Sequence, residues 1–360
     1  GISAAGQFGI GRLVGAGYCR RLVFETSVKG EKIKTRLELD VDFVENVLRD
    51  SSDDSSANEL MDAATQLKRS AEKEEAHYFK VFLEDIKPDY DQLLDEELVT
   101  DYLKEVAPID FSLPFKSRYY NAIEEEYKPY SNGLSYVNIS VNQQNDIRKR
   151  YGLKIEGTED TIEELECFII KDDKYGELAW GWFALTKFSK AIPASDANRG
   201  LRLRKHNIQI GDQTVLNKYF TEARGSNYFY GEVHVLHDQI KPDSGRSGLA
   251  PTPESLRLLD LLKVKFVELK KLYNIANEAK NAVKNILDLS SRASSGEYTP
   301  EEAETHKNNI KPATEKFTKI ETKAGELPST QKVVDLYKKE LETKKETPST
   351  RPAKTKKDKP

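Results

Sequence analysis

The sequence predicts an α+β protein that consists of an incomplete α/β sandwich, a second α+β domain and a helical C-terminal region. A glycine-rich turn close to the first residue runs into an apolar segment, and strands of antiparallel character follow it. Strand-like runs dominate between Pro108 and Pro251, and beyond Pro253 apolar residues recur every three or four positions. We place the boundaries at residues 1–86 (sandwich), 87–107 (helical connector), 108–250 (second domain), 251–345 (helical hairpin or coiled coil) and 346–360 (disordered basic tail).

Composition narrows the class of protein. The chain has 360 residues, with 60 acidic against 56 basic ones and a formal net charge of -4, which gives no general argument for binding nucleic acid. No stretch approaches the ~18 uninterrupted apolar residues of a membrane span, and we expect no membrane partner. Two cysteines, Cys19 and Cys167, cannot build a disulfide framework or a zinc site. We therefore expect a cytoplasmic protein.

In the first domain, the glycine-rich turn is expected to open a short helix and to be followed by a hairpin. Ile10, Leu13 and Val14 suit one face of that helix. Gly30 lies in a turn between two strand-like runs, which is typical of a hairpin. The expected elements are strands at 21–26, 35–41 and 78–83, a helix around 60–75 and, in the connector, a helix at 93–106.

The second domain is expected to be rich in strands. Pro108 and Pro114 mark the change of domain. Trp180 and Trp182 flank a glycine, and we expect both to pack on one face of a strand. The expected elements are strands at 136–141, 165–171, 177–185, 201–210 and 231–236, a short helix at 215–219 and a further helix around residue 161.

The C-terminal region is expected to be helical. Leu259, Leu262 and Phe266 begin an apolar stripe that continues to Leu287 and predicts one long helix at 254–289. A stripe of this length is typical of a coiled coil or helical hairpin, and we expect it to hold two subunits together as a homodimer. The remaining expected elements are a turn at 290–296, a helix from Pro300 with Thr299 as its N-cap, and a helix at 330–345.

The glycine-rich turn itself is a candidate phosphate site. It comprises Gly6, Gln7, Phe8, Gly9, Ile10, Gly11 and Arg12. Glycines let backbone N–H groups point at an anion, and a helix that starts directly behind them adds the favourable end of its dipole. No Gly-Lys-Ser/Thr follows, so the turn is not a Walker loop, and no βαβ unit supports a dinucleotide fingerprint. A tight strand-to-helix corner is the alternative interpretation.

The first six of these residues, Gly6 to Gly11, closely resemble the second glycine box of the GHKL ATPases, the superfamily of gyrase, HtpG-type chaperones, MutL and histidine kinases. Arg12 stands where HtpG has an aromatic residue. The resemblance is closest to HtpG, and it implies that the residues bind the phosphates of ATP, with a magnesium ion. It also implies that residues 108–250 form a transducer-type domain with a split β-α-β arrangement. The family's Glu-Asn and Asp-Gly-Gly boxes are absent from the chain and would precede Gly1, so we expect the chain to start inside a domain. A half-site that lacks the general base and the magnesium ligand should neither bind ATP tightly nor hydrolyse it.

A second group of candidates lies in the middle of the chain. Arg202 and Arg204 share one face of an expected strand, where cations protecting a sheet edge are the alternative interpretation. The stretch 231–247 resembles the HtpG segment whose loop arginine reaches the γ-phosphate, and Arg246 matches that arginine. A guanidinium suits this task because it is always charged and binds two oxygens at once. The alternative for Arg246 is an ordinary surface arginine, and the competing phosphate contacts are Lys187, Lys190, Arg202 and Arg204.

Other chemistry-bearing residues have simpler interpretations. His206, His234 and His237 lack supporting cysteine or carboxylate ligands, so we expect solvated or hydrogen-bonded histidines and no metal site. Lysines crowd the last residues, from Lys354 to Lys359, and we interpret them as a solvated tail and not as a nucleic-acid contact.

Three functional hypotheses follow. The resemblance implies part of an ATP-binding, ATP-hydrolysing HtpG-like chaperone, in which closure around ATP couples domains and protomers and acts on protein clients. A MutL-like or MORC-like DNA-associated clamp would share the first two domains. A non-enzymatic scaffold, in which the glycine turn is only a corner, is the third hypothesis.

Overall fold

The computed structural model describes residues 13–50, 52, 54–130, 134–294 and 298–346 of the chain. It contains two compact units, Gly1–Tyr102 and Leu103–Pro360, which we describe separately. Within the described residues each unit has one β-sheet, and the second unit also carries the C-terminal helices. The predicted α+β class with a helical C-terminal region is therefore confirmed. Among the described helices, none has the length and apolar character that crossing a membrane requires.

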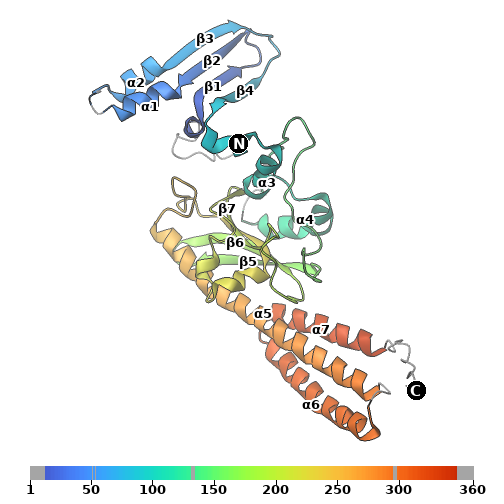
Figure 1. The fold of residues 1–360 in the computed structure, drawn as a ribbon. Coiled ribbons are helices and arrows are strands. Elements are labelled where there is room, and N and C mark those ends of the chain that lie inside the picture. The colour runs from blue at the N-terminus through green and yellow to red at the C-terminus, as the bar shows by residue number, and fades with distance from the viewer. Residues whose placement is uncertain (1–12, 51, 53, 131–133, 295–297, 347–360) are drawn as a thin grey trace, which may run out of the picture. The chain divides into compact units, whose positions relative to one another are not determined.

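Unit 1 is built on a four-stranded antiparallel sheet with the strand order β3-β2-β1-β4 (Figure 1). The predicted hairpin around Gly30 is confirmed, because β1 pairs with β2 along its length. The elements are η2 (Val14–Gly17), β1 (Cys19–Ser27), β2 (Ile33–Asp40), α1 (Val41–Arg49), α2 (Ala57–Ala64), β3 (Thr65–Ala71), β4 (Tyr78–Ile86), η3 (Pro88–Leu94) and α3 (Glu96–Val106), which continues into unit 2.

The helix predicted around 60–75 is wrong in its second half. A capping box between Ser56 and Glu59 starts α2, but this helix ends at Ala64 and the chain continues directly as β3. Leu67 of β3 pairs with Leu37 of β2, so the backbone of this segment is satisfied by a neighbouring strand. The many polar residues of β3 suit a strand at the edge of a sheet.

The sheet of unit 1 has one charged and one apolar face. On the charged face, Arg36 forms ion pairs with Glu38 and Glu84. On the apolar face, Leu22 and Leu39 pack with residues of α1 and α2. Away from these helices the apolar face of the sheet is exposed. Three of its side chains remain 43–62% exposed: Leu67, Phe79 and Val81. The described helices of unit 1 therefore cover only part of the apolar face of its sheet.

Unit 2 contains a mixed five-stranded sheet with the order β5-β6-β9-β7-β8 (Figure 1). β7 and β9 are parallel, and the other neighbours are antiparallel. The predicted strand at 201–210 is in fact a short hairpin, because His206 and Asn207 adopt positive φ angles and reverse the chain. The strands are β5 (Glu164–Asp172), β6 (Gly176–Leu185), β7 (Gly200–Lys205), β8 (Ile208–Gln209) and β9 (Tyr230–Val235).

One face of this sheet is covered by α4 (Leu113–Tyr127) together with the irregular segment 134–163. The sequence did not predict α4, because Pro114 indicated a break, whereas a proline at the start of a helix is favourable. The strand predicted at 136–141 and the helix predicted near Thr161 are both wrong. The N–H of Val137 donates to the carbonyl of Pro108, and Thr161 lies in an isolated β-bridge with Lys154. Trp180 and Trp182 pack on this face, as predicted.

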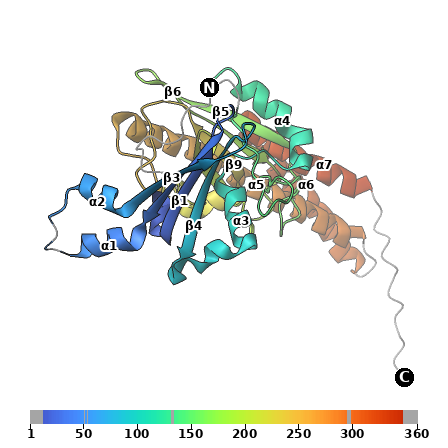
Figure 2. The same ribbon diagram turned by 90° about the horizontal axis from the view of Figure 1, so that it is seen from above.

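The opposite face is covered by α5 (Pro253–Ser294), which runs on into a three-helix arrangement with α6 (Pro300–Ala324) and α7 (Pro328–Glu346) (Figures 1 and 2). The predicted long helix is confirmed and extends through Ser294, so the turn expected at 290–296 is wrong for residues 290–294, which are helical, and 295–296 lie outside the described residues. Thr299 caps α6 as predicted, within a capping box that includes Glu302. The apolar stripe of α5 is buried against the sheet, α6 and α7 of the same chain. Short 3-10 segments, η4 (Asn217–Tyr219) and η5 (Ala223–Tyr228), complete the unit.

Candidate functional site

The predicted phosphate-binding turn, Gly6 to Arg12, lies outside the described residues. The other candidate residues all belong to unit 2, and the structure places them in three different surroundings. Arg246 lies in a loop beyond β9, Arg202 and Arg204 lie inside the sheet, and Lys187 lines a cavity between helices.

Arg246 lies in a loop, residues 243–248, that one carboxylate holds together. Asp243 accepts hydrogen bonds from the backbone N–H of Ser247 at 2.9 Å and from the hydroxyl of Ser247 at 2.8 Å. The backbone N–H of Arg246 donates to the carbonyl of Asp243 at 3.0 Å, and that of Asp243 donates to the carbonyl of Gly248 at 3.0 Å. The loop therefore has a defined shape that does not depend on the arginine side chain.

The backbone of Arg246 is left-handed, with φ of 53°. This conformation is unfavourable for a residue with a side chain, and such strain concentrates at functional sites. Two contacts fix the residue against the end of β8: its carbonyl accepts from the N–H of Gly211 at 2.6 Å, and Nη2 donates to the carbonyl of Gln209 at 3.5 Å. The side chain is partly exposed at this position. A charged group is thus held by a strained, well-fixed backbone.

Arg202 and Arg204 are not cations on a sheet edge, because β7 lies between β9 and β8 and both residues are 2% exposed. Arg204 Nε lies 2.7 Å from Glu232 Oε1. Its Nη1 donates to the carbonyl of Asn207 at 2.9 Å, and its Nη2 donates to the carbonyl of Glu105 at 2.7 Å. Arg202 donates to the carbonyl of Ala197. A phosphate could reach either guanidinium only after contacts inside the unit were broken.

Glu232 is the centre of a buried charge network. Lys149 Nζ lies 2.9 and 3.0 Å from its two oxygens, His234 Nε2 lies 3.0 Å away, and the hydroxyl of Tyr151 donates at 3.3 Å. Burial would raise the pKa of Glu232, but Arg204 and Lys149 outweigh it and hold that pKa well below its usual range. Burial, then the charge of Arg204, lowers the pKa of Lys149 to about 7.

Few features of the sequence indicate this network of charges. Glu232 and His234 alternate within an expected strand, so a shared face could be predicted. Lys149 belongs to the irregular segment between α4 and β5, and its partner is 83 positions away. Burial lowers the pKa of His234, which is consistent with a neutral, hydrogen-bonded ring.

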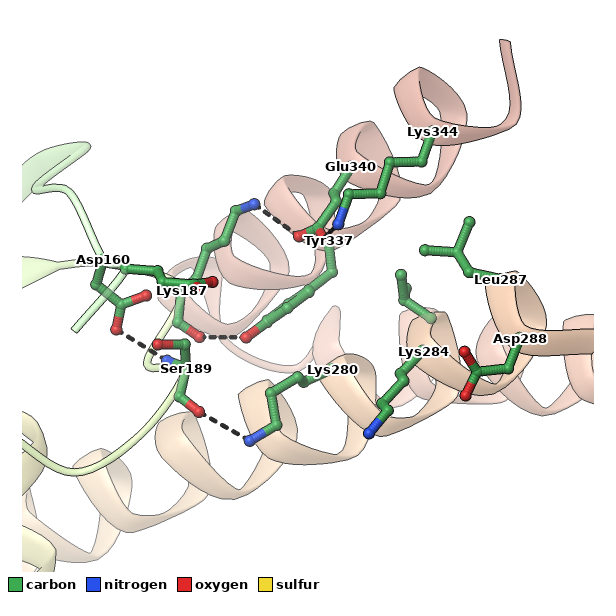
Figure 3. A pocket seen from close by; sticks show the side chains of 12 residues that line it. Asp160, Lys187, Ser189, Lys280, Lys284, Leu287, Asp288, Tyr337, Glu340 and Lys344 are labelled. Carbon is green, nitrogen blue, oxygen red and sulfur yellow. Dashed lines mark hydrogen bonds and ion pairs between the residues drawn. The ribbon is translucent and has the colours of Figure 1, made fainter. Parts of the chain in front are cut away.

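Lys187 lines a cavity of about 590 Å³ in unit 2 (Figure 3). Its Nζ donates to Glu340 of α7 at 2.7 Å, and Lys344 binds the other oxygen of the same carboxylate. Lys280 of α5 donates to the carbonyl of Ser189, two residues beyond Lys187, and Tyr337 donates to the carbonyl of Lys187 (Figure 3). Lys190 is exposed in the same loop. Lys187 is therefore engaged in holding α7 to the segment that follows β6, and Ser189 of the same segment holds α5.

The structure therefore brings Arg202 and Arg204 onto one buried face and keeps Arg246 partly exposed at the end of β8. Lys187 binds the C-terminal helix α7 through Glu340 and Tyr337. Of the candidates in unit 2, Arg246 combines partial exposure, a permanent charge and a strained backbone. Comparison with models of known protein families finds no match, and comparison with curated proteins finds no relative.

Proposed function

We propose that the chain is part of an ATP-binding, ATP-hydrolysing protein of the GHKL superfamily, similar to HtpG-type chaperones. In this proposal Gly6 to Arg12 bind the phosphates of ATP, and Arg246 contacts the γ-phosphate when the protein closes around the nucleotide. The observation that carries the proposal is the Arg246 loop, which presents a permanent cation from a strained and fixed backbone. Such preorganised charge stabilises a transferring phosphoryl group without further rearrangement.

The architecture of both units supports the proposal. The open apolar face of unit 1, with Leu67, Phe79 and Val81, is what a sandwich with an uncovered sheet would show. The parallel pairing of β7 with β9 in unit 2 is compatible with the split β-α-β arrangement of a transducer domain. ATP needs a magnesium ion for hydrolysis, and we assign neither the magnesium ligand nor the general base to residues of this chain.

Coupling between two protomers is part of the same proposal. The apolar stripe of α5 does not require a second subunit, because α6, α7 and the sheet already bury it. A homodimer through the C-terminal helices would instead use outward residues such as Leu256, Val264 and Val267, which are 46–62% exposed. Protein clients remain an expectation from the resemblance to HtpG.

A DNA-associated clamp is the second hypothesis. It would retain the full-length protein on DNA at low salt and release it as salt rises, because phosphate contacts release counterions. Suppression of client aggregation without retention on DNA would favour the chaperone.

The proposal is tested by ATP turnover of the full-length protein with Gly9→Val and Gly11→Val. Both side chains would obstruct the close approach of backbone to phosphate, so we expect turnover to fall more than ~10-fold. Gly17→Ala is the matched control, because a Cβ at Gly17 meets no atom within 4 Å. Turnover that survives both valine substitutions would leave the glycine turn as a simple corner and contradict its assignment to the phosphates. A wild-type protein without any ATP turnover would instead support the scaffold hypothesis.

A further inference from the structure

Arg204 binds three separate segments of unit 2 with one side chain. Its guanidinium contacts the carboxylate of Glu232 on β9, the carbonyl of Asn207 in the β7–β8 turn and the carbonyl of Glu105 at the end of α3. We infer that Arg204 is a positioning residue, which ties the helix joining the two units to the strand that supports Arg246. The expected effect of Arg204 on catalysis rests on the proposed function. The structural link from α3 to the Arg246 loop does not depend on that function.

The contact with Glu105 anchors the end of α3. The last carbonyls of a helix have no partner within the helix, and they form the negative end of its dipole. A buried guanidinium supplies both a hydrogen-bond donor for a terminal carbonyl and a positive charge at the negative end of the dipole. The compact units meet between Tyr102 and Leu103, so α3 begins in unit 1 and ends in unit 2. Its terminal turn is therefore the point at which the connecting helix is fixed to unit 2.

The contact with Asn207 leads towards Arg246. Asn207 has φ of 61° and precedes β8, whose last residue, Gln209, accepts the hydrogen bond from Arg246 Nη2. Two residues farther on, the N–H of Gly211 donates to the carbonyl of Arg246 at 2.6 Å. A movement of the β7–β8 turn would therefore displace the backbone that holds Arg246. Hydrogen-bonded networks of this kind can carry coupling between sites.

Arginine suits this position better than lysine. A planar guanidinium donates in several fixed directions, whereas an ammonium on a flexible stem cannot match three acceptors with one geometry. Arg204→Lys keeps the charge beside Glu232 and should lose at least one of the two carbonyl contacts. His234→Gln is the matched control, because His234 is equally buried and binds Glu232 but has no contact with α3.

Hydrogen exchange of the chain tests the structural part. The reporters are the N–H of Ala107, which bonds to Leu103 at the end of α3, and the N–H of Gly211. In Arg204→Lys we expect both to exchange at least ~10-fold faster, while amides of α6 keep their rates. His234→Gln should leave both reporters unchanged. Val106→Gly, which loosens the end of α3 and leaves Arg204 in place, should accelerate Gly211 as well. Unchanged exchange at Gly211 in both Arg204→Lys and Val106→Gly overturns the inference.

Kinetics of the full-length protein test the catalytic part. Arg204→Lys should lower kcat for ATP about 5-fold to 10-fold and leave KM unchanged, since a displaced Arg246 weakens the transition state and not ground-state binding. If Arg246→Ala lowers turnover while Arg204→Lys does not, the positioning role is wrong and the proposed function stands. If Arg246→Ala leaves ATP turnover unchanged, the proposed function fails. Hydrogen exchange at Gly211 then still tests whether Arg204 links α3 to the Arg246 loop.

Discussion

Lys149 and Glu232 form an ion pair inside unit 2, with Nζ 2.9 Å from Oε1 and side chains that are 1% and 0% exposed. Arg204 lies 2.7 Å from the same oxygen, so one carboxylate balances two buried cations. Because arginine does not release its proton in proteins, Lys149 is the one of these two cations that can lose its charge. The network fixes the irregular segment 134–163 to the sheet.

Glu232→Gln should destabilise unit 2 by about 3–5 kcal/mol, because it leaves two buried cations without a counter-charge. The measurement is urea unfolding followed by tryptophan fluorescence, which reports on unit 2 because Trp180 and Trp182 both belong to β6. Glu278→Gln is the control, since it breaks an exposed ion pair with Lys323 and should cost less than about 1 kcal/mol. Equal losses of unfolding free energy in the two variants would show that Glu232 does not balance the two buried cations.

The stability of unit 2 should rise with pH between 7 and 8.5. The pKa of Lys149 is lowered to about 7, first by burial and then by Arg204, whereas an unfolded lysine titrates near ~10.4. In this window the unfolded chain holds a proton that the folded protein has released, so raising the pH favours folding. Lys205, whose pKa burial lowers to about 8, acts in the same direction.

Lys149→Met isolates the contribution of Lys149. It should reduce the dependence of unfolding free energy on pH by up to ~1.4 kcal/mol per pH unit. Urea unfolding at pH 7.0, 7.75 and 8.5 measures this. Unfolded cysteine, which titrates near ~8.5, contributes equally to the wild type and to Lys149→Met and cancels in the comparison. If the wild type and Lys149→Met give parallel pH profiles, Lys149 keeps its proton in the folded state and the argument is wrong.

Gly231→Ala should prevent normal packing of the sheet. A Cβ at this position would lie 2.1 Å from the carbonyl oxygen of Trp182 and 2.8 Å from Leu201. Neither the backbone of β6 nor a buried leucine can yield by so much, and we expect a loss above ~3 kcal/mol or failure to fold. Gly176→Ala meets no atom within 4 Å and should cost only ~1 kcal/mol for its positive φ. Thermal unfolding by tryptophan fluorescence compares the two, and a Gly231→Ala protein as stable as Gly176→Ala would refute the predicted clash.

The elements that could be predicted from the sequence are those in which the spacing of apolar residues determines the secondary structure. The strands now described as β1 and β6 and the helix α5 were found because their apolar residues lie at strand or helix spacing. Residues 136–141 show the same alternation, but Val137 and Ile139 bond to Pro108 and Ile147, which lie outside strands, and Asn142 and Gln143 then turn the chain with positive φ. The edge strand β3 was missed because its neighbours, and not its own composition, determine its pairing.

The candidate site was predictable only in part. The resemblance singled out Arg246, but the left-handed backbone and the role of Asp243 depend on the folded loop. The partners of Arg204 come from α3, the β7–β8 turn and β9, and no spacing in the sequence indicates that they meet. Long-range pairing of charges therefore required the structure.

ATP turnover by the full-length protein with Arg246→Ala tests the proposed contact between this arginine and the γ-phosphate. We expect kcat to fall more than ~10-fold while nucleotide affinity changes little, because the arginine meets the γ-phosphate mainly in the closed state. Arg246→Lys should retain part of the rate by keeping the charge. Turnover at the wild-type level in Arg246→Ala would remove this residue from the site and contradict the account.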